Sequence, residues 1–104
     1  MIDWKENNIG YLTADDFVKN RKACLASLKE RKNSDLILDC STFLPMPKEL
    51  EEVRVHQQKL GLCFVLVLSP DHMHSFPPSW VIVPTKKEAL DFISFEQMQR
   101  DLGF

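Results

Sequence analysis

Apolar residues occur in two patterns along this chain. Short continuous runs, typical of buried strands, alternate with longer segments in which apolar residues recur every three or four positions, as on one face of a helix. The runs predict strands at Asp35–Cys40, Cys63–Leu68 and Trp80–Val83. A weaker alternation within residues 1–12 predicts one or two short strands, with a turn at Asn7-Asn8.

Two helices are expected before residue 62. Thr13 suits the N-terminal cap of the first, and Asn33-Ser34 interrupts the helical pattern after it. Pro47 suits the first position of the second helix, and Gly61 suits its C-terminal stop. The positions expected to face the core are Phe17, Cys24, Leu25 and Leu28 in the first helix, and Leu50, Val53, Gln57 and Leu60 in the second.

A third helix is expected after Pro84. Thr85 and Glu88 have the spacing of a capping box, in which the side chain of each residue bonds the backbone N–H of the other. Inward positions are Ala89, Leu90 and Ile93, and a second apolar set at Phe92, Phe95, Gln99 and Leu102 predicts a bend or a restart near Ser94.

This order of elements predicts the α/β class, with a mostly parallel sheet covered by helices in a single domain of residues 1–104. One connection is short for a parallel crossover, because only the eleven residues Ser69–Ser79 separate two of the strands. Either a helical turn near Asp71–Ser75 completes this crossover, or the link is an extended strap.

Composition removes several classes of function. A formal net charge of −2 gives no electrostatic basis for binding nucleic acid. The longest apolar run, Leu62–Leu68, is too short to span a bilayer, and the N-terminus MIDWKENN lacks the apolar segment of a secretory signal. Because Cys24, Cys40 and Cys63 share no CxxC spacing and have apolar neighbours, we expect reduced core thiols in a cytoplasmic protein.

One loop carries residue types that bind metals. Asp71, His72 and His74 lie close together, and His56 is a further imidazole that zinc or copper could use. Exposed loops also carry histidines without any metal. A small metal- or ligand-binding protein using this loop is therefore kept as an alternative.

The end of the Asp35–Cys40 run suggests a second kind of chemistry. Cys40 is followed by two hydroxyl residues, but a reactive thiolate needs a helix N-terminus or a basic partner, and no basic residue occurs before Lys48. Asp39 is either a buried carboxylate with a raised pKa or an acceptor for loop amides. The chain contains no GxGxxG, GxxxxGK[ST], GxSxG or HExxH motif.

The segment Phe76–Trp80 places two aromatic residues around a pair of prolines. It fits a hydrophobic strap that closes the edge of the sheet. It also fits a ridge that binds a partner, because aromatic residues serve as anchors in protein interfaces.

Four segments together resemble the STAS family, the anti-sigma factor antagonist-like domains of bacteria. They are LILDCS, PKELEEVRVHQQKLG, CFVLVLS and VIVPTKKEALDFISFEQMQRDLGF. The last segment matches best, through Pro84, Thr85, Glu88, Ala89 and Leu90, and the step Gly10-Tyr11-Leu12-Thr13-Ala14 matches the entry into the first helix. The resemblance covers residues 9–104 and implies a STAS-like sheet of four or five strands with helices mainly on one face.

The chain departs from this family in the loop before the second helix. Signalling members carry a phospho-acceptor there in an Asp-Ser-Ser-Gly or Asp-Thr-Ser-Gly loop, where the helix N-terminus suits a phosphate. This chain reads FLPMPKEL instead, so no residue matches the acceptor. The resemblance therefore implies a degenerate member that lacks the phosphoswitch.

The leading functional prediction is a non-enzymatic protein-interaction module in bacterial regulation, without a cofactor. Its partner would be a protein, such as an anti-sigma or kinase-like regulator. The alternative is a phospho-regulated switch in which Ser41 or Thr42 is the acceptor and its phosphate meets the N-terminus of the second helix. The candidate partner-binding residues are Phe43, Leu44, Met46, Pro47, Glu49, Glu52 and Arg54.

Overall fold

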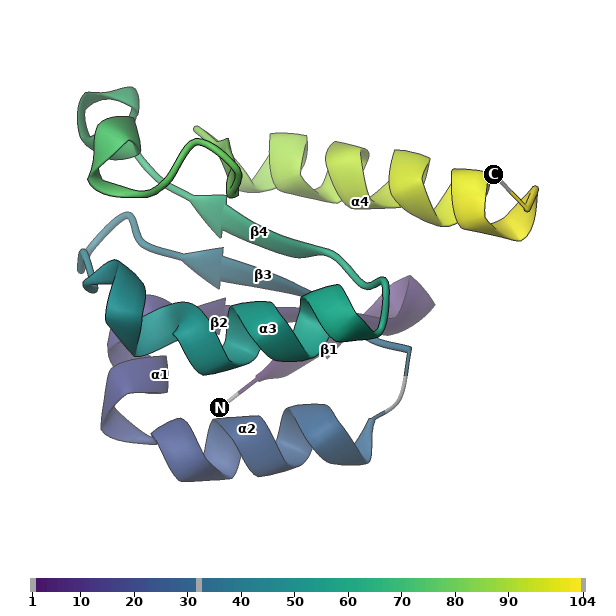
Figure 1. Ribbon diagram of the computed structural model, residues 1–104, viewed down its shortest axis with the longest axis horizontal. Coiled ribbons are helices and arrows are strands. Elements are labelled where there is room, and N and C mark those ends of the chain that lie inside the picture. Colours follow the sequence, from purple (N-terminus) through teal and green to yellow (C-terminus); the bar gives the residue numbers. More distant parts are fainter. Residues whose placement is uncertain (1, 32, 104) are drawn as a thin grey trace.

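A computed structural model describes residues 2–31 and 33–103, which form a five-stranded sheet with helices on both faces (Figure 1). The predicted α/β class is confirmed. The strands follow one another across the sheet in sequence order; β1 pairs antiparallel with β2, and all later pairs are parallel. The strands are β1 (Asp3–Lys5), β2 (Ile9–Thr13), β3 (Asp35–Asp39), β4 (Phe64–Val67) and β5 (Val81–Val83).

Helices fill the connections between the parallel strands and follow the last of them. The α-helices are α1 (Ala14–Lys19), α2 (Arg21–Glu30), α3 (Glu51–Lys59) and α4 (Lys86–Asp101). Shorter 3₁₀ turns are η1 (Glu6–Asn8), η2 (Pro47–Leu50) and η3 (Pro70–Ser75). Within the described part of the chain, no helix combines the length and the apolar content that crossing a membrane requires.

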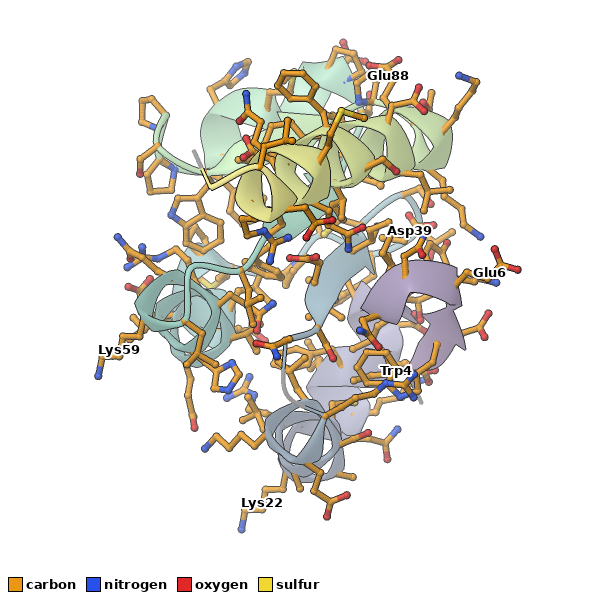
Figure 2. All side chains as sticks on the ribbon, turned by 90° about the vertical axis from the view of Figure 1, so that its right-hand side faces the viewer. Trp4, Glu6, Lys22, Asp39, Lys59 and Glu88 are labelled. Atoms are coloured by element: carbon orange, nitrogen blue, oxygen red, sulfur yellow. The ribbon has the colours of Figure 1, made fainter. Side chains whose placement is uncertain are left out.

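The sheet separates two cores, because successive side chains of a strand point to opposite faces. Leu36 and Leu38 of β3 pack with residues of α1, α2 and α3 on one face. Ile37 lies on the other face, where it packs with Ala89 and Ile93 of α4. Figure 2 looks along α2 and α3 and shows α4 on the opposite side of the sheet. One helix therefore covers the second face.

The predicted first helix is divided in two, which the sequence pattern did not reveal. Asn20 has φ −127° and ψ 41°, outside the helical region, and separates α1 from α2. The apolar spacing continues across this break because Phe17 of α1 and Leu25 of α2 pack in the same core. Thr13 stands at the N-cap position, but its side chain makes no capping hydrogen bond.

The second helix begins with Pro47 as predicted, but its first turn is the 3₁₀ turn η2. Gly61 ends the segment with a positive φ of 68°, which confirms the predicted stop. Leu60 was expected inside and is 57% exposed, because α3 ends at Lys59 and the chain turns there. The other three expected core positions of this segment, Leu50, Val53 and Gln57, are buried.

The predicted bend near Ser94 is wrong, since α4 is a single helix. The second apolar set did not require a bend, because Phe95 and Leu102 point to solvent and are 57% and 65% exposed. One half of the predicted capping box is confirmed, because Oγ1 of Thr85 accepts a hydrogen bond from the N–H of Glu88 at 3.2 Å. The reciprocal bond from the N–H of Thr85 to the side chain of Glu88 is absent among the described residues.

The short crossover between β4 and β5 contains the helical turn η3. This confirms the first of the two predicted alternatives, a helical turn that completes the crossover. After this turn Phe76 is buried, and its ring centre lies 5.2 Å from that of Trp80. The ring centre of Trp80 lies 6.2 Å from that of Phe64 in β4. The Phe76–Trp80 segment is therefore a strap, and it packs against the core that contains Leu36 and Leu38.

Candidate functional site

The loop of residues 40–47 leaves the carboxyl end of the sheet, where the parallel strands β2–β5 stop. It is fixed at its start, because the N–H of Ser41 donates to Oδ1 of Asp39 at 2.9 Å. Pro45 is buried and holds its middle. The loop exposes three large apolar side chains, which we call the apolar step: Phe43 (41%), Leu44 (40%) and Met46 (56%).

Glu49 fixes the far end of the apolar step. Its Oε1 accepts a hydrogen bond from the N–H of Met46 at 3.1 Å, and its Oε2 lies 3.5 Å from a guanidinium nitrogen of Arg21 in α2. Glu52 similarly lies 3.7 Å from Lys29. These two glutamates, which were expected on a partner-binding surface, thus connect the second helical segment to α2.

Arg54 lies apart from the apolar step. Its guanidinium bonds Glu51 and Gln58 on its own helix and stands 5.7 Å from the ring centre of Trp80. The predicted partner-binding residues therefore do not form one surface. Arg54 lies toward the strap. The others that lie together in one segment are Phe43, Leu44, Met46, Pro47 and Glu49.

A polar group on the second face of the sheet was missed in the sequence. The hydroxyl of Tyr11 donates to Oδ2 of Asp39, and Nζ of Lys86 stands 4.2 Å from the centre of the Tyr11 ring. Burial, reinforced by the hydrogen bond to Asp39 and its charge, raises the pKa of Tyr11 to about 12. The sequence did contain a pattern that could have predicted this contact. The alternation of β2 puts Tyr11 on the same face as Thr13, and Thr13 is paired with Asp39 in β3.

Asp39 acts as an acceptor for the loop amide, which was one of the two predicted roles. The other role, a carboxyl with a raised pKa, is wrong. Burial raises the pKa of Asp39, but hydrogen bonds from Ser41 and Tyr11 and the charge of Lys86 outweigh it, so that the pKa is lowered. Asp39 is thus ionised at neutral pH and cannot donate a proton there.

The candidate phospho-acceptors Ser41 and Thr42 are both exposed. The helical N-terminus that a phosphate would meet is already served by a carboxylate, because Glu49 accepts the N–H of Met46. Asp39 adds a second negative charge directly beside Ser41. A phosphate on Ser41 would therefore stand beside Asp39, whereas Thr42 lines a depression together with Lys19.

The candidate metal ligands Asp71, His72 and His74 are exposed on η3. His56 lies on α3, where its Nδ1 is 2.9 Å from Oε1 of Gln57. No group of three or more histidine, cysteine or acidic side chains suited to a metal occurs within residues 2–31 and 33–103.

The three cysteines are free thiols. Burial raises the pKa of Cys40 to about 12, with a further contribution from the charge of Asp39. Burial likewise raises the pKa of Cys63 to about 12 and raises that of Cys24. These thiols are protonated at neutral pH, which makes them poor nucleophiles.

The amino end of the sheet holds a second polar group, which the sequence did not suggest. The carboxylate of Asp35 is fully buried and accepts bonds from Arg100 at 2.8 and 2.9 Å, from Gln97 at 2.8 Å and from the N–H of Cys63 at 2.7 Å. Gln57 is also buried, and its Nε2 donates to the carbonyls of Ser34 and Cys63. The bonds of Gln97 and Arg100 fasten α4 to β3 at this end, and those of Gln57 fasten α3.

We compared the chain with protein-family models, with curated proteins and with solved structures, and no match was found. The resemblance to STAS domains therefore stays a prediction.

Proposed function

We propose that this chain is a non-enzymatic protein-interaction module that binds a partner protein through the apolar step. The observation that carries the proposal is the exposure of Phe43, Leu44 and Met46, three large apolar side chains within four residues. Exposed apolar side chains that lie together are a mark of interaction surfaces.

The apolar step is also held in place before any partner arrives. The N–H of Ser41 is bonded to Asp39, the N–H of Met46 is bonded to Glu49, and Pro45 between them is buried. A loop that is already ordered loses little conformational entropy on binding, so more of the apolar contact contributes to affinity. Lys19 and Thr42 lie beside Phe43 at the edge of a shallow depression, which gives the apolar step a polar rim.

The resemblance to STAS domains favours a regulatory partner, such as an anti-sigma or kinase-like protein of the bacterial cytoplasm. The phospho-regulated switch is the second candidate, favoured by the exposure of Ser41 and Thr42 beside the apolar step. Intact-mass measurement after incubation with a partner kinase tests it. A mass unchanged by the kinase would exclude the switch.

The interaction proposal is tested by changing Leu44 and Met46 to glutamate in one variant. The matched control is Leu60→Glu, since Leu60 and Met46 are almost equally exposed, at 57% and 56%, and Leu60 lies at the far end of α3. We expect the parent and the control to retain a partner in pull-down and size-exclusion experiments, and the double variant to lose it. Equal retention by all three proteins, with unchanged circular dichroism, would refute the assignment of the surface.

A further inference from the structure

A cavity of about 380 Å³ lies between α3 and α4, at the amino ends of β4 and β5. This volume falls within the range of small-molecule sites, roughly 300–1,000 Å³. The apolar step leaves the opposite end of the strands, so the proposed partner binding does not use this cavity. Its lining includes the aromatic residues Phe64, Trp80 and Phe92 and the charged residues Arg54, Glu96 and Arg100.

Trp80 in this lining is held by packing against two other aromatic rings. Trp80 contacts Phe64 and the buried Phe76 through its ring, with centre-to-centre distances of 6.2 and 5.2 Å. Phe92 lines the cavity from α4 and packs against the core on the other face of the sheet. Three aromatic side chains therefore contribute apolar surface to the cavity, which suits a flat apolar group.

Arg100 brings a fixed positive charge to this cavity. Both of its bonds to the buried Asp35 use one nitrogen, Nη2, at 2.8 and 2.9 Å. Within residues 2–31 and 33–103, no hydrogen bond engages its Nε or Nη1, and 34% of the side chain is exposed. Asp35 thus orients the guanidinium, while Nε and Nη1 each keep N–H donors for an acceptor from outside.

Arg54 lines the same cavity but differs from Arg100 in its donors. Its Nε and Nη2 bond the carboxylate of Glu51, and its Nη1 donates to Gln58 at 2.8 Å. All three nitrogens are therefore engaged on its own helix. This comparison leaves Arg100 as the arginine equipped to take up an anion.

We propose that the cavity binds a small organic carboxylate, whose apolar body contacts Trp80 and Phe92 and whose carboxylate accepts from the free N–H groups of Arg100. A hydrogen bond from a guanidinium N–H to a carboxylate oxygen is charge-assisted, and it is about twice as strong as a bond between neutral groups. Glu96 stands one turn before Arg100 and also lines the cavity, so a single negative charge suits the site better than the double charge of a phosphate.

The probe is 3-phenylpropanoate, and its uncharged amide, 3-phenylpropanamide, has the same size and shape. The measurement uses a Trp4→Phe protein, in which Trp80 is the only tryptophan, so that its fluorescence reports the cavity directly. We expect saturable binding of the acid with a dissociation constant of about 1 mM or below, and binding of the amide at least tenfold weaker. Equal affinities, or no saturable change with the acid, would overturn the proposal.

Two arginine variants locate the carboxylate. Arg100→Lys keeps a charge for Asp35 but loses the N–H donors of Nε and Nη1, and we expect it to weaken binding of the acid at least tenfold. Arg54→Lys is the matched control and should change the affinity less than threefold. If Arg54→Lys had the larger effect, the assignment to Arg100 would be wrong. If Arg100→Lys does not fold, as judged by circular dichroism, the comparison of acid and amide decides alone.

A third variant tests the sign of the charge. Glu96→Gln removes the negative charge that faces the ligand, so the acid should bind at least threefold more tightly while the amide is unaffected. Weaker binding of the acid by this variant would contradict the proposed orientation.

Discussion

Asp35 and Asp39 begin and end the same strand, β3, and their side chains lie on the same face of the sheet, yet their environments differ. Asp35 is fully buried and is bonded by a guanidinium, an amide side chain and a backbone N–H. Asp39 is partly exposed and is bonded by a phenol hydroxyl and a loop amide. One aspartate fastens a helix to the sheet, and the other shapes a surface loop.

The difference teaches that the position of a carboxylate along a strand says little about its burial. Both partner side chains of Asp35 come from the second half of α4, 62 and 65 residues later in the chain. The amino end of the sheet is therefore closed by long-range contacts with Gln97 and Arg100, whereas the carboxyl end keeps exposed side chains. Five predictions test this contrast, and the changes in stability are given from the largest to the smallest.

Replacing Arg100 with methionine should have the largest effect. Asp35 would keep a buried charge without its cation, and we expect a loss of about 2–4 kcal/mol in the free energy of unfolding. This is below the cost for a fully enclosed pair because a third of Arg100 is exposed. Urea denaturation followed by circular dichroism measures the loss. The double variant with Asp35→Asn should recover part of it, and a double variant that loses the sum of both single effects would show that the pair is not coupled.

Replacing Tyr11 with phenylalanine should cost about 1–2 kcal/mol at neutral pH, because the hydrogen bond to the ionised Asp39 is lost. The pKa of Tyr11 is raised in the folded protein, so its contribution is complete below pH 10 and is lost as the pH rises toward about 12. Urea denaturation at pH 7 and at pH 11 should show the two proteins becoming more alike at the higher pH. A constant difference would contradict the assigned pKa shift.

Tyr11 is the one tyrosine of the chain, so its titration can be followed directly by ultraviolet absorbance. We expect a midpoint of about 12 in the parent protein. In an Asp39→Asn variant the midpoint should fall toward the ordinary value of 10.0, since both contributions of Asp39 act to raise it. An unchanged midpoint would assign the whole shift to burial.

Replacing Thr85 with alanine removes the cap of α4 at the carboxyl end of the sheet. The N–H of Glu88 loses its acceptor, and the expected cost is about 1 kcal/mol in thermal or urea unfolding. Thr42→Ala is the control, because Thr42 is exposed on the loop and should change stability by less than about 0.5 kcal/mol. Equal effects of the two substitutions would argue against capping.

Replacing Lys87 with glutamine should have the smallest effect. Lys87 and Asp91 form an ion pair of 3.0 Å on the same helix as Arg100, but both side chains are largely exposed. The change in unfolding free energy should stay within about 0.5 kcal/mol and should shrink in high salt. This pair and the Arg100–Asp35 pair have similar lengths, so the two variants isolate the effect of burial.

Local patterns were sufficient to predict much of the fold. The apolar run around β4 and the cap at Thr85 each depend on neighbouring residues, and both are confirmed. The break at Asn20 was missed because the apolar spacing continues through it. The bend near Ser94 was expected because an apolar stripe that faces solvent looks, in the sequence, like one that faces a core.

The candidate sites also divide into those that neighbouring residues could predict and those that depend on distant contacts. The apolar step was proposed from its own letters, FLPMP, and its exposure agrees with that prediction. The bonds between Tyr11 and Asp39 and between Asp35 and Arg100 join residues 28 and 65 positions apart, and no local pattern specifies such pairings. The cavity between α3 and α4 was missed for the same reason, because its walls come from three separate segments of the chain.

The single helix on the second face also has a consequence for synthesis of the chain. All five strands have been made once Val83 is joined, but Ile37 and Val65 stay uncovered on that face until α4 follows. The residues that cover this face are thus joined last, and a chain that ends before Lys86 would keep an apolar surface that chaperones can recognise.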